Sequence, residues 1–96
     1  YELIKLITTG DTDSEQFKKG ILVFPNPSNG RLFIENNSNY AIDKIQIFST
    51  LGSLIVEIKS VSKCSEIDLR HIPFGMYYVQ ITSEEGYKET RKIIFE

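Results

Sequence analysis

Short runs of aliphatic, β-branched and aromatic residues, separated by turn residues, recur along most of the chain. After Gly20 these runs lie near residues 21–24, 31–36, 42–48, 53–59, 65–69, 76–82 and 88–95. Short strands at a spacing of about 8–12 residues are typical of β-sandwiches and barrels. No stretch keeps a 3.6-residue period over two turns, so the pattern predicts an all-β fold.

Apolar and polar residues alternate within several runs. Successive side chains of a strand face opposite sides, so each alternating set predicts one buried face. Three such sets are Leu32 with Ile34, Ile45 with Ile47, and the longer stripe Tyr77, Val79 and Ile81. The length of the third set predicts a central strand.

A rigid corner separates the first two runs. Pro25 and Pro27 each fix φ and lack a backbone donor, so neither a helix nor a central strand can pass through them. Asn26 precedes a proline and is therefore restricted to an extended conformation. Gly30 can adopt a positive φ at no steric cost, which suits the end of a turn.

A second break lies at Ile72-Pro73-Phe74-Gly75. Pro73 cannot occupy a central strand, and Gly75 relieves a tight bend. We expect this segment to carry the chain to the opposite sheet. Tyr77 then has two interpretations: a tyrosine corner with its hydroxyl bound to the backbone, or a half-buried strand residue. Gly52, after Leu51, predicts another turn with a positive φ.

The first 20 residues differ from the rest. Tyr1–Thr9 is rich in Leu and Ile and predicts one strand, which belongs either to a preceding region or to this domain. Gly10–Gly20 is polar and bracketed by glycines, with Phe17 as its one sizeable apolar residue, and predicts a flexible, poorly packed linker. The predicted division is therefore 1–20, the end of a preceding region with a linker, and 21–96, the domain.

Composition excludes several classes of function. The 96 residues suffice for one domain with a small core. A net charge of −2 provides no basic stripe for nucleic acid. No apolar run approaches the roughly 20 residues that span a bilayer. Cys64 is the single cysteine, which excludes an internal disulfide.

Catalytic candidates are few. Cys64 and His71, each the only residue of its type, would have to meet across the fold to form a nucleophile–base pair, with a third group to orient the base. A loop histidine and a structural or surface thiol are the simpler interpretation. We therefore expect no enzyme, cofactor or metal site. A carbohydrate-binding or adhesive module is the alternative function, with Tyr40, Tyr78 and Tyr87 as possible sugar platforms.

Four local patterns follow one another in order. They are Phe24-Pro25-Asn26-Pro27-Ser28-Asn29-Gly30, Ile45-x-Ile47-Phe48-x-x-Leu51-Gly52, Ile67-Asp68-Leu69-x-x-Ile72-Pro73-x-Gly75-Met76-Tyr77, and the terminal Lys92-Ile93-Ile94-Phe95-Glu96. Together they resemble the C-terminal sorting domain of proteins exported by the type IX secretion system, the outer-membrane route of Bacteroidetes. The resemblance covers Ile21–Glu96.

The resemblance implies a fold and a function. The fold would be an immunoglobulin-like antiparallel β-sandwich of about seven strands. The domain would be an address read by the type IX translocon in the periplasm, then removed by a surface sortase, so that an N-terminal cargo ends at the cell surface or is secreted. Edge strands could be read by strand addition. The residues we expect to determine shape are Pro25, Asn26, Pro27, Gly30, Gly52, Gly75 and Tyr77, and the presented terminal strand is Lys92, Ile93, Ile94, Phe95 and Glu96.

Overall fold

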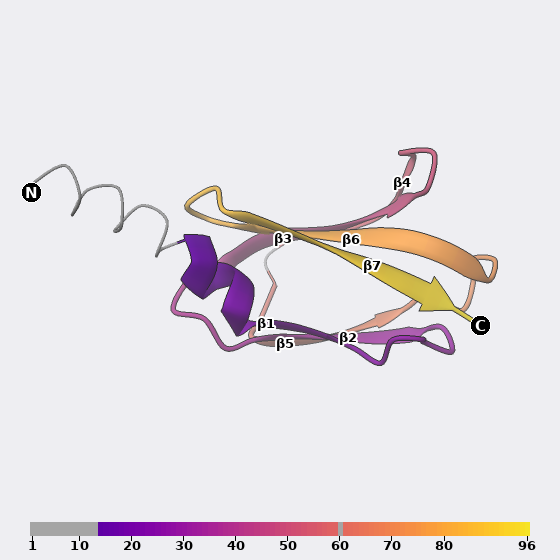
Figure 1. Cartoon of the computed structure of the whole chain (residues 1–96), viewed down its shortest axis with the longest axis horizontal. Coiled ribbons are helices and arrows are strands. Elements are labelled where there is room, and N and C mark those ends of the chain that lie inside the picture. Colours follow the sequence, from indigo (N-terminus) through magenta and orange to yellow (C-terminus); the bar gives the residue numbers. More distant parts are fainter. Residues whose placement is uncertain (1–13, 60) are drawn as a thin grey trace, which may run out of the picture.

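Seven strands and one short helix make up the part of the chain that the computed structural model describes, residues 14–59 and 61–96 (Figure 1). Each strand end lies within one residue of its predicted run, which confirms the all-β prediction. The expected strand at Tyr1–Thr9 lies outside the described residues. The strands are β1 (Ile21–Phe24), β2 (Arg31–Asn36), β3 (Ile42–Ser49), β4 (Leu54–Lys59), β5 (Cys64–Asp68), β6 (Gly75–Ser83) and β7 (Lys88–Phe95).

The strands form two antiparallel sheets that pack face to face as a sandwich (Figure 1). The three-stranded sheet has the order β1-β2-β5, and the four-stranded sheet has the order β4-β3-β6-β7. The Ile72–Gly75 segment links β5 in one sheet to β6 in the other, as predicted from Pro73 and Gly75. Strand β6 lies between β3 and β7, which confirms the central strand.

The core lies between the two sheets and consists of the alternating residues. All three predicted sets are buried, and none of their members exceeds 8% exposure. Burial of each aliphatic side chain contributes about 1.5–3 kcal/mol, so these sets account for much of the stability of a small domain. Further core side chains come from β1, β5 and β7 and from the adjoining segments: Ile21, Ile67, Leu69, Ile93 and Phe95.

The prediction of a poorly packed linker is wrong for residues 14–20, which form a helix. Phe17 of this helix is fully buried in the core. Its ring centroid lies 6.3 Å from those of Tyr40 and Tyr87, which contact each other edge to face at 5.3 Å. At the helix end, a Cβ on Gly20 would lie 2.5 Å from the backbone nitrogen of Ser38, so only glycine permits this approach.

Arg91 of β7 fixes the end of the helix to the sandwich. Its guanidinium donates hydrogen bonds to the carbonyl oxygens of Lys18 and Ile21, each at 3.1 Å. Carbonyls at a helix C-terminus lack intrahelical partners, and a cation there is favourable with respect to the helix dipole. The Glu89 carboxylate accepts a further hydrogen bond from the same guanidinium. No helix in the described part of the chain is long and apolar enough to cross a membrane.

Candidate functional site

The proline corner and the terminal strand, which the sequence presents as separate motifs, lie side by side. Strand β7 is the last strand of its sheet, and β6 pairs with one of its edges along the whole length. The corner, residues 24–30, lies against the other edge, where Ser28 forms a parallel bridge with Phe95. The chain end and the start of the domain therefore form one unit.

Asn26 connects the two through its side chain. The Nδ2 group donates to the carbonyl oxygen of Lys92 at 3.0 Å, and Oδ1 accepts from the backbone N–H of Ile94 at 3.2 Å. A residue of a parallel strand would bond to its neighbour in the same way, through one donor and one acceptor to groups two residues apart. The primary amide of Asn26 thus takes the place of a backbone peptide.

Ser28 continues this pattern with its own backbone. Its N–H donates to the carbonyl oxygen of Ile94 at 2.7 Å, and its carbonyl oxygen accepts from the N–H of Glu96 at 2.9 Å. The Ser28 side chain is buried, donates to the carbonyl oxygen of Arg31 at 2.7 Å and accepts from the N–H of Gly30 at 3.1 Å. These bonds hold the corner in the shape that meets the strand.

Gly30 ends the corner with φ of 109°, in the region that favours glycine. A Cβ at this position would also lie 2.8 Å from Cγ of Arg70. Arg70 is held in place by Asp68, whose carboxylate accepts hydrogen bonds from its guanidinium at 2.9 and 2.7 Å. These side-chain hydrogen bonds are the largest cause that lowers the pKa of the Asp68 carboxyl. The hydrogen bond from the backbone N–H of Arg70 is the next largest.

The expectation that the terminal strand offers an open edge is wrong for residues 92–96. Outward-facing backbone groups of Lys92, Ile94 and Glu96 already have partners in the corner. A partner adding a strand here would first have to displace Asn26 and Ser28.

The inner face of the terminal strand is buried. Ile93 and Phe95 are at most 2% exposed, whereas Ile94 between them is 39% exposed. The Phe95 ring lies 5.3 Å from that of Tyr77. The hydroxyl of Tyr77 donates to the carbonyl oxygen of Pro73 at 2.7 Å, so the tyrosine-corner interpretation is confirmed over the half-buried alternative.

The structure brings most of the predicted shape residues together. Pro25, Asn26, Pro27 and Gly30 belong to the corner, with cis peptide bonds before both prolines, and Gly75 and Tyr77 pair with Phe95 and Ile93 of the terminal strand.

Gly52 is the exception. It lies in the turn between β3 and β4, with φ of 88° as predicted, and β6 separates β3 from β7. It therefore belongs to a different part of the surface, where Leu51 is 94% exposed.

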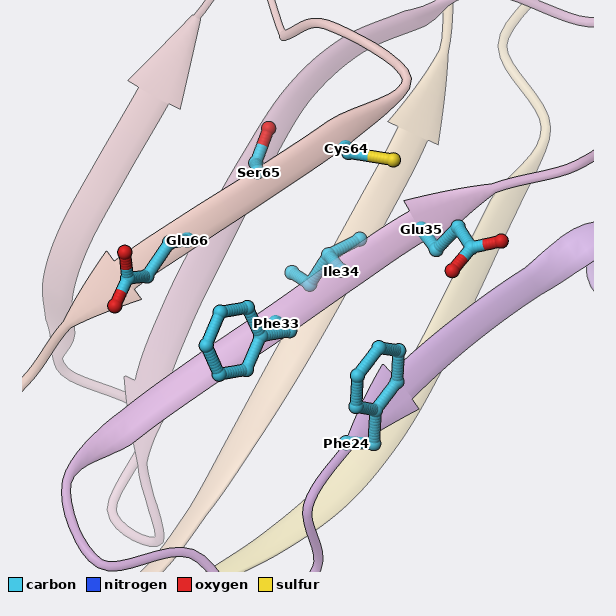
Figure 2. A pocket seen from close by; sticks show the side chains of 7 residues that line it. All are labelled: Phe24, Phe33, Ile34, Glu35, Cys64, Ser65 and Glu66. Atoms are coloured by element: carbon cyan, nitrogen blue, oxygen red, sulfur yellow. The ribbon is translucent and has the colours of Figure 1, made fainter.

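A shallow hollow lies on the outer face of the three-stranded sheet (Figure 2). Its floor includes the rings of Phe24 and Phe33, whose centroids are 5.8 Å apart and whose planes differ by 17°. Glu35 and Glu66 border the rings, and Cys64 lies at the far side. Of the tyrosines considered as sugar platforms, Tyr40 and Tyr87 pack against Phe17 instead, and Tyr78 is exposed on the opposite sheet.

Cys64 and His71 do not meet. Cys64 is exposed at the start of β5, and His71 follows the end of that strand. Strand β5 is roughly 13 Å long, with Cys64 at its start and His71 beyond its far end. Among the described residues, no group of three or more acidic, His or Cys side chains is placed to hold a metal ion.

The protein is a β-sandwich whose last strand is hydrogen-bonded to the corner that follows its first strand. Residues 22–96 match the family model described as the secretion system C-terminal sorting domain, and the chain belongs to that family. It is also 32% identical over 88 residues to an ulvan lyase of Nonlabens ulvanivorans, a match that spans 91% of this chain and 16% of that protein. The domain is a C-terminal sorting signal of type IX secretion cargo.

Three residues that hold the domain together are not among the site residues expected from the sequence. Phe17 is the one sizeable apolar residue of a polar segment, and its isolation is the signal that it has a partner. Ser28 appears in the sequence only as a member of the corner motif, although a serine two residues before a glycine can cap the turn. Arg91 carried no signal, because its partners are backbone carbonyls 70 and 73 residues away.

Proposed function

We propose that the type IX translocon reads this domain as a folded unit, in which the corner and the terminal strand are one element. The observation that supports the proposal is the double contact of Asn26 with Lys92 and Ile94. Because of this contact, the conformation of residues 92–96 depends on Asn26, which lies almost 70 positions earlier in the chain. On this view the domain carries its cargo from the periplasm across the outer membrane to the cell surface.

We also propose that a surface sortase separates cargo and signal on the N-terminal side of residue 14. Proteases cut segments that fit an extended active-site conformation, and exposed, loosely packed backbone is the preferred substrate. Residues 14–20 are helical, with Phe17 in the core and Lys18 bonded to Arg91. A cut within this helix would require it to leave the sandwich, so we expect the cut before it.

The test is export of a fusion. The full 96-residue chain, placed behind an unrelated periplasmic reporter in a host with type IX machinery, should carry the reporter to the surface. The matched variant Asn26→Ala should reduce export while leaving the sheets intact by circular dichroism. Asn29→Ala is the control, because Asn29 is exposed in the same corner and its side chain bonds to no described residue.

Two results would contradict the proposal. If the wild-type fusion stays in the periplasm although its sorting domain is folded, the chain is not a sufficient address. If Asn26→Ala and Asn29→Ala are exported equally well, the coupling of corner and chain end is not what the machinery reads. The position of the cut is checked by mass spectrometry of released reporter, which should end before residue 14.

A further inference from the structure

The three-stranded sheet is one strand narrower than the sheet it packs against. The corner joins the end of β1 to the outer edge of β7, so these two strands lie on the same side of the sandwich. Counted from that side, β2 faces β6 and β5 faces β3. No strand in the described part of the chain is then left to lie opposite β4.

Burial on the inner face of β4 agrees with this strand count. Val56 and Ile58 of β4 lie directly across from Ile47 and Ile45 of β3, so all four side chains point between the sheets. Ile45 and Ile47 are fully buried, whereas Val56 and Ile58 are only half-buried. Inward-facing side chains of a sandwich bury against the opposite sheet. The inner face of β4 therefore lacks part of its cover.

The position that would supply this cover lies beside β5, whose outer edge is unpaired. The N–H of Leu69 donates to the carbonyl oxygen of Gly30 on the β2 side, at 2.7 Å. Backbone groups alternate between the two edges of a strand, so those of Cys64, Glu66 and Asp68 point away from β2. The Cys64 carbonyl accepts from the hydroxyl two residues earlier. The outward groups of Glu66 and Asp68 have no partner among the described residues.

We propose that a protein of the translocon adds an extended segment to the outer edge of β5, and that alternate apolar side chains of this segment cover Val56 and Ile58. This docking rests on the proposed sorting function and adds the edge that is read. An extended segment fits because its backbone supplies donors and acceptors at the spacing of a strand edge. The alternation of its side chains then places every second residue between the sheets.

A second copy of this chain fits the edge less well. Full antiparallel overlap of two β5 strands would place the two copies of Glu66 directly opposite each other, and like charges in that position are destabilising. The ion pair of Glu66 with Arg31, at 3.6 Å, is half-exposed and offsets only part of this repulsion. Charged residues on an edge strand oppose pairing between identical domains. The edge therefore favours a different chain, without an acidic residue opposite Glu66.

Amide hydrogen exchange of the purified 96-residue chain, with and without the purified translocon of a type IX host, tests the docking directly. In the free chain the amides of Glu66 and Asp68 should exchange rapidly, whereas that of Ile67, which points to β2, should be protected. Addition of the translocon should slow exchange at Glu66 and Asp68 by roughly tenfold or more. Unchanged exchange at these two amides in translocon-bound chain would overturn the inference.

The free chain also tests the other occupants of this edge. Protection of Glu66 in a chain that sediments as a monomer would show that another segment of the same chain covers the edge. Protection that appears only together with dimers would assign the edge to a second copy. Either result would overturn the assignment to a translocon protein.

Export of the reporter fusion provides a second test. Glu66→Pro removes the outward N–H and leaves the hydrogen bonds to β2 in place, as proline on an edge strand allows. Glu66→Thr is the matched control, because it removes the same charge and keeps the N–H. We expect Glu66→Pro to lower the exported fraction by roughly tenfold, since one backbone bond is lost and the ring obstructs the incoming strand. Glu66→Thr should export like the wild type.

A third variant leaves the edge of β5 unchanged and alters the surface that the added segment covers. Val56→Thr with Ile58→Thr should also lower export, whereas Leu54→Thr with Ile55→Thr, at exposed positions of the same strand, should not. Thermal unfolding of each purified variant shows whether the sandwich is intact. A variant without cooperative unfolding is set aside, and the exchange measurement on the wild type then decides.

The outcomes separate this inference from the proposed function. If the wild-type fusion is exported, and folded Glu66→Pro and Val56→Thr/Ile58→Thr variants are exported equally well, the inference is overturned and the sorting function stands. If the wild-type fusion stays in the periplasm although its sorting domain is folded, the sorting function itself fails.

Discussion

Replacing Asn26 by alanine tests the link between the corner and the chain end. The substitution removes both hydrogen bonds to β7, those to Lys92 and Ile94. Each bond is solvent-exposed, so its net contribution lies at the lower end of the usual range, about 0.5–1 kcal/mol. We therefore expect Asn26→Ala to lower the free energy of unfolding by about 1–2 kcal/mol. For a domain of this size that corresponds to a fall in Tm of roughly 5–15 °C.

The measurement is thermal and urea unfolding followed by circular dichroism. Asn29→Ala is the control in the same corner and should change the free energy of unfolding by less than about 0.5 kcal/mol. Asn26→Asp has nearly the same shape as the wild type, but it places an oxygen opposite the Lys92 carbonyl where Nδ2 now donates. It should destabilise the domain at neutral pH by at least as much as alanine. Equal stability of Asn26→Ala and Asn29→Ala would refute the reasoning.

Three further predictions concern other parts of the fold. Phe17→Ala should cost about 3–5 kcal/mol in urea unfolding, because the ring is fully buried; a negligible cost would show that the helix of residues 14–20 does not dock. Arg91→Lys should cost about 1 kcal/mol, since an ammonium cannot reach the carbonyl oxygens of both Lys18 and Ile21 while holding Glu89. The pKa of Asp68 is lowered in the folded state, so its contribution is complete above about pH 4 and is lost as pH falls towards the folded-state pKa. Asp68→Asn should therefore flatten the acid limb of the stability profile, and an unchanged limb would contradict the assigned Arg70 contact.

Much of the sandwich could be predicted because it depends on local pattern. The alternation of Tyr77, Val79 and Ile81 specifies one buried face whatever the partner strand is. Pro73 and Gly75 specify a break regardless of where the chain goes next. These rules act over a few residues, so strand positions and the change of sheet could be predicted from the sequence.

The features that could not be predicted depend on contacts between distant residues. Pro25 and Pro27 predict a corner, but nothing in the motif shows that Asn26 points at a strand 66 residues later. A single phenylalanine in a polar segment has too little local pattern to predict a helix; Phe17 is placed by its contacts with Tyr40 and Tyr87. Tertiary packing overrides weak local preference in both cases.

Amide hydrogen exchange at the chain end tests the central claim most directly. The N–H groups of Ile94 and Glu96 point away from β6, and in a free edge strand they would exchange rapidly with solvent. Because they bond to Asn26 and to the carbonyl of Ser28, we predict that both are protected in the wild type. In Asn26→Ala the Ile94 amide should lose its protection while Ile93, paired with β6, keeps it. Rapid exchange of Ile94 and Glu96 in the wild type would contradict the account.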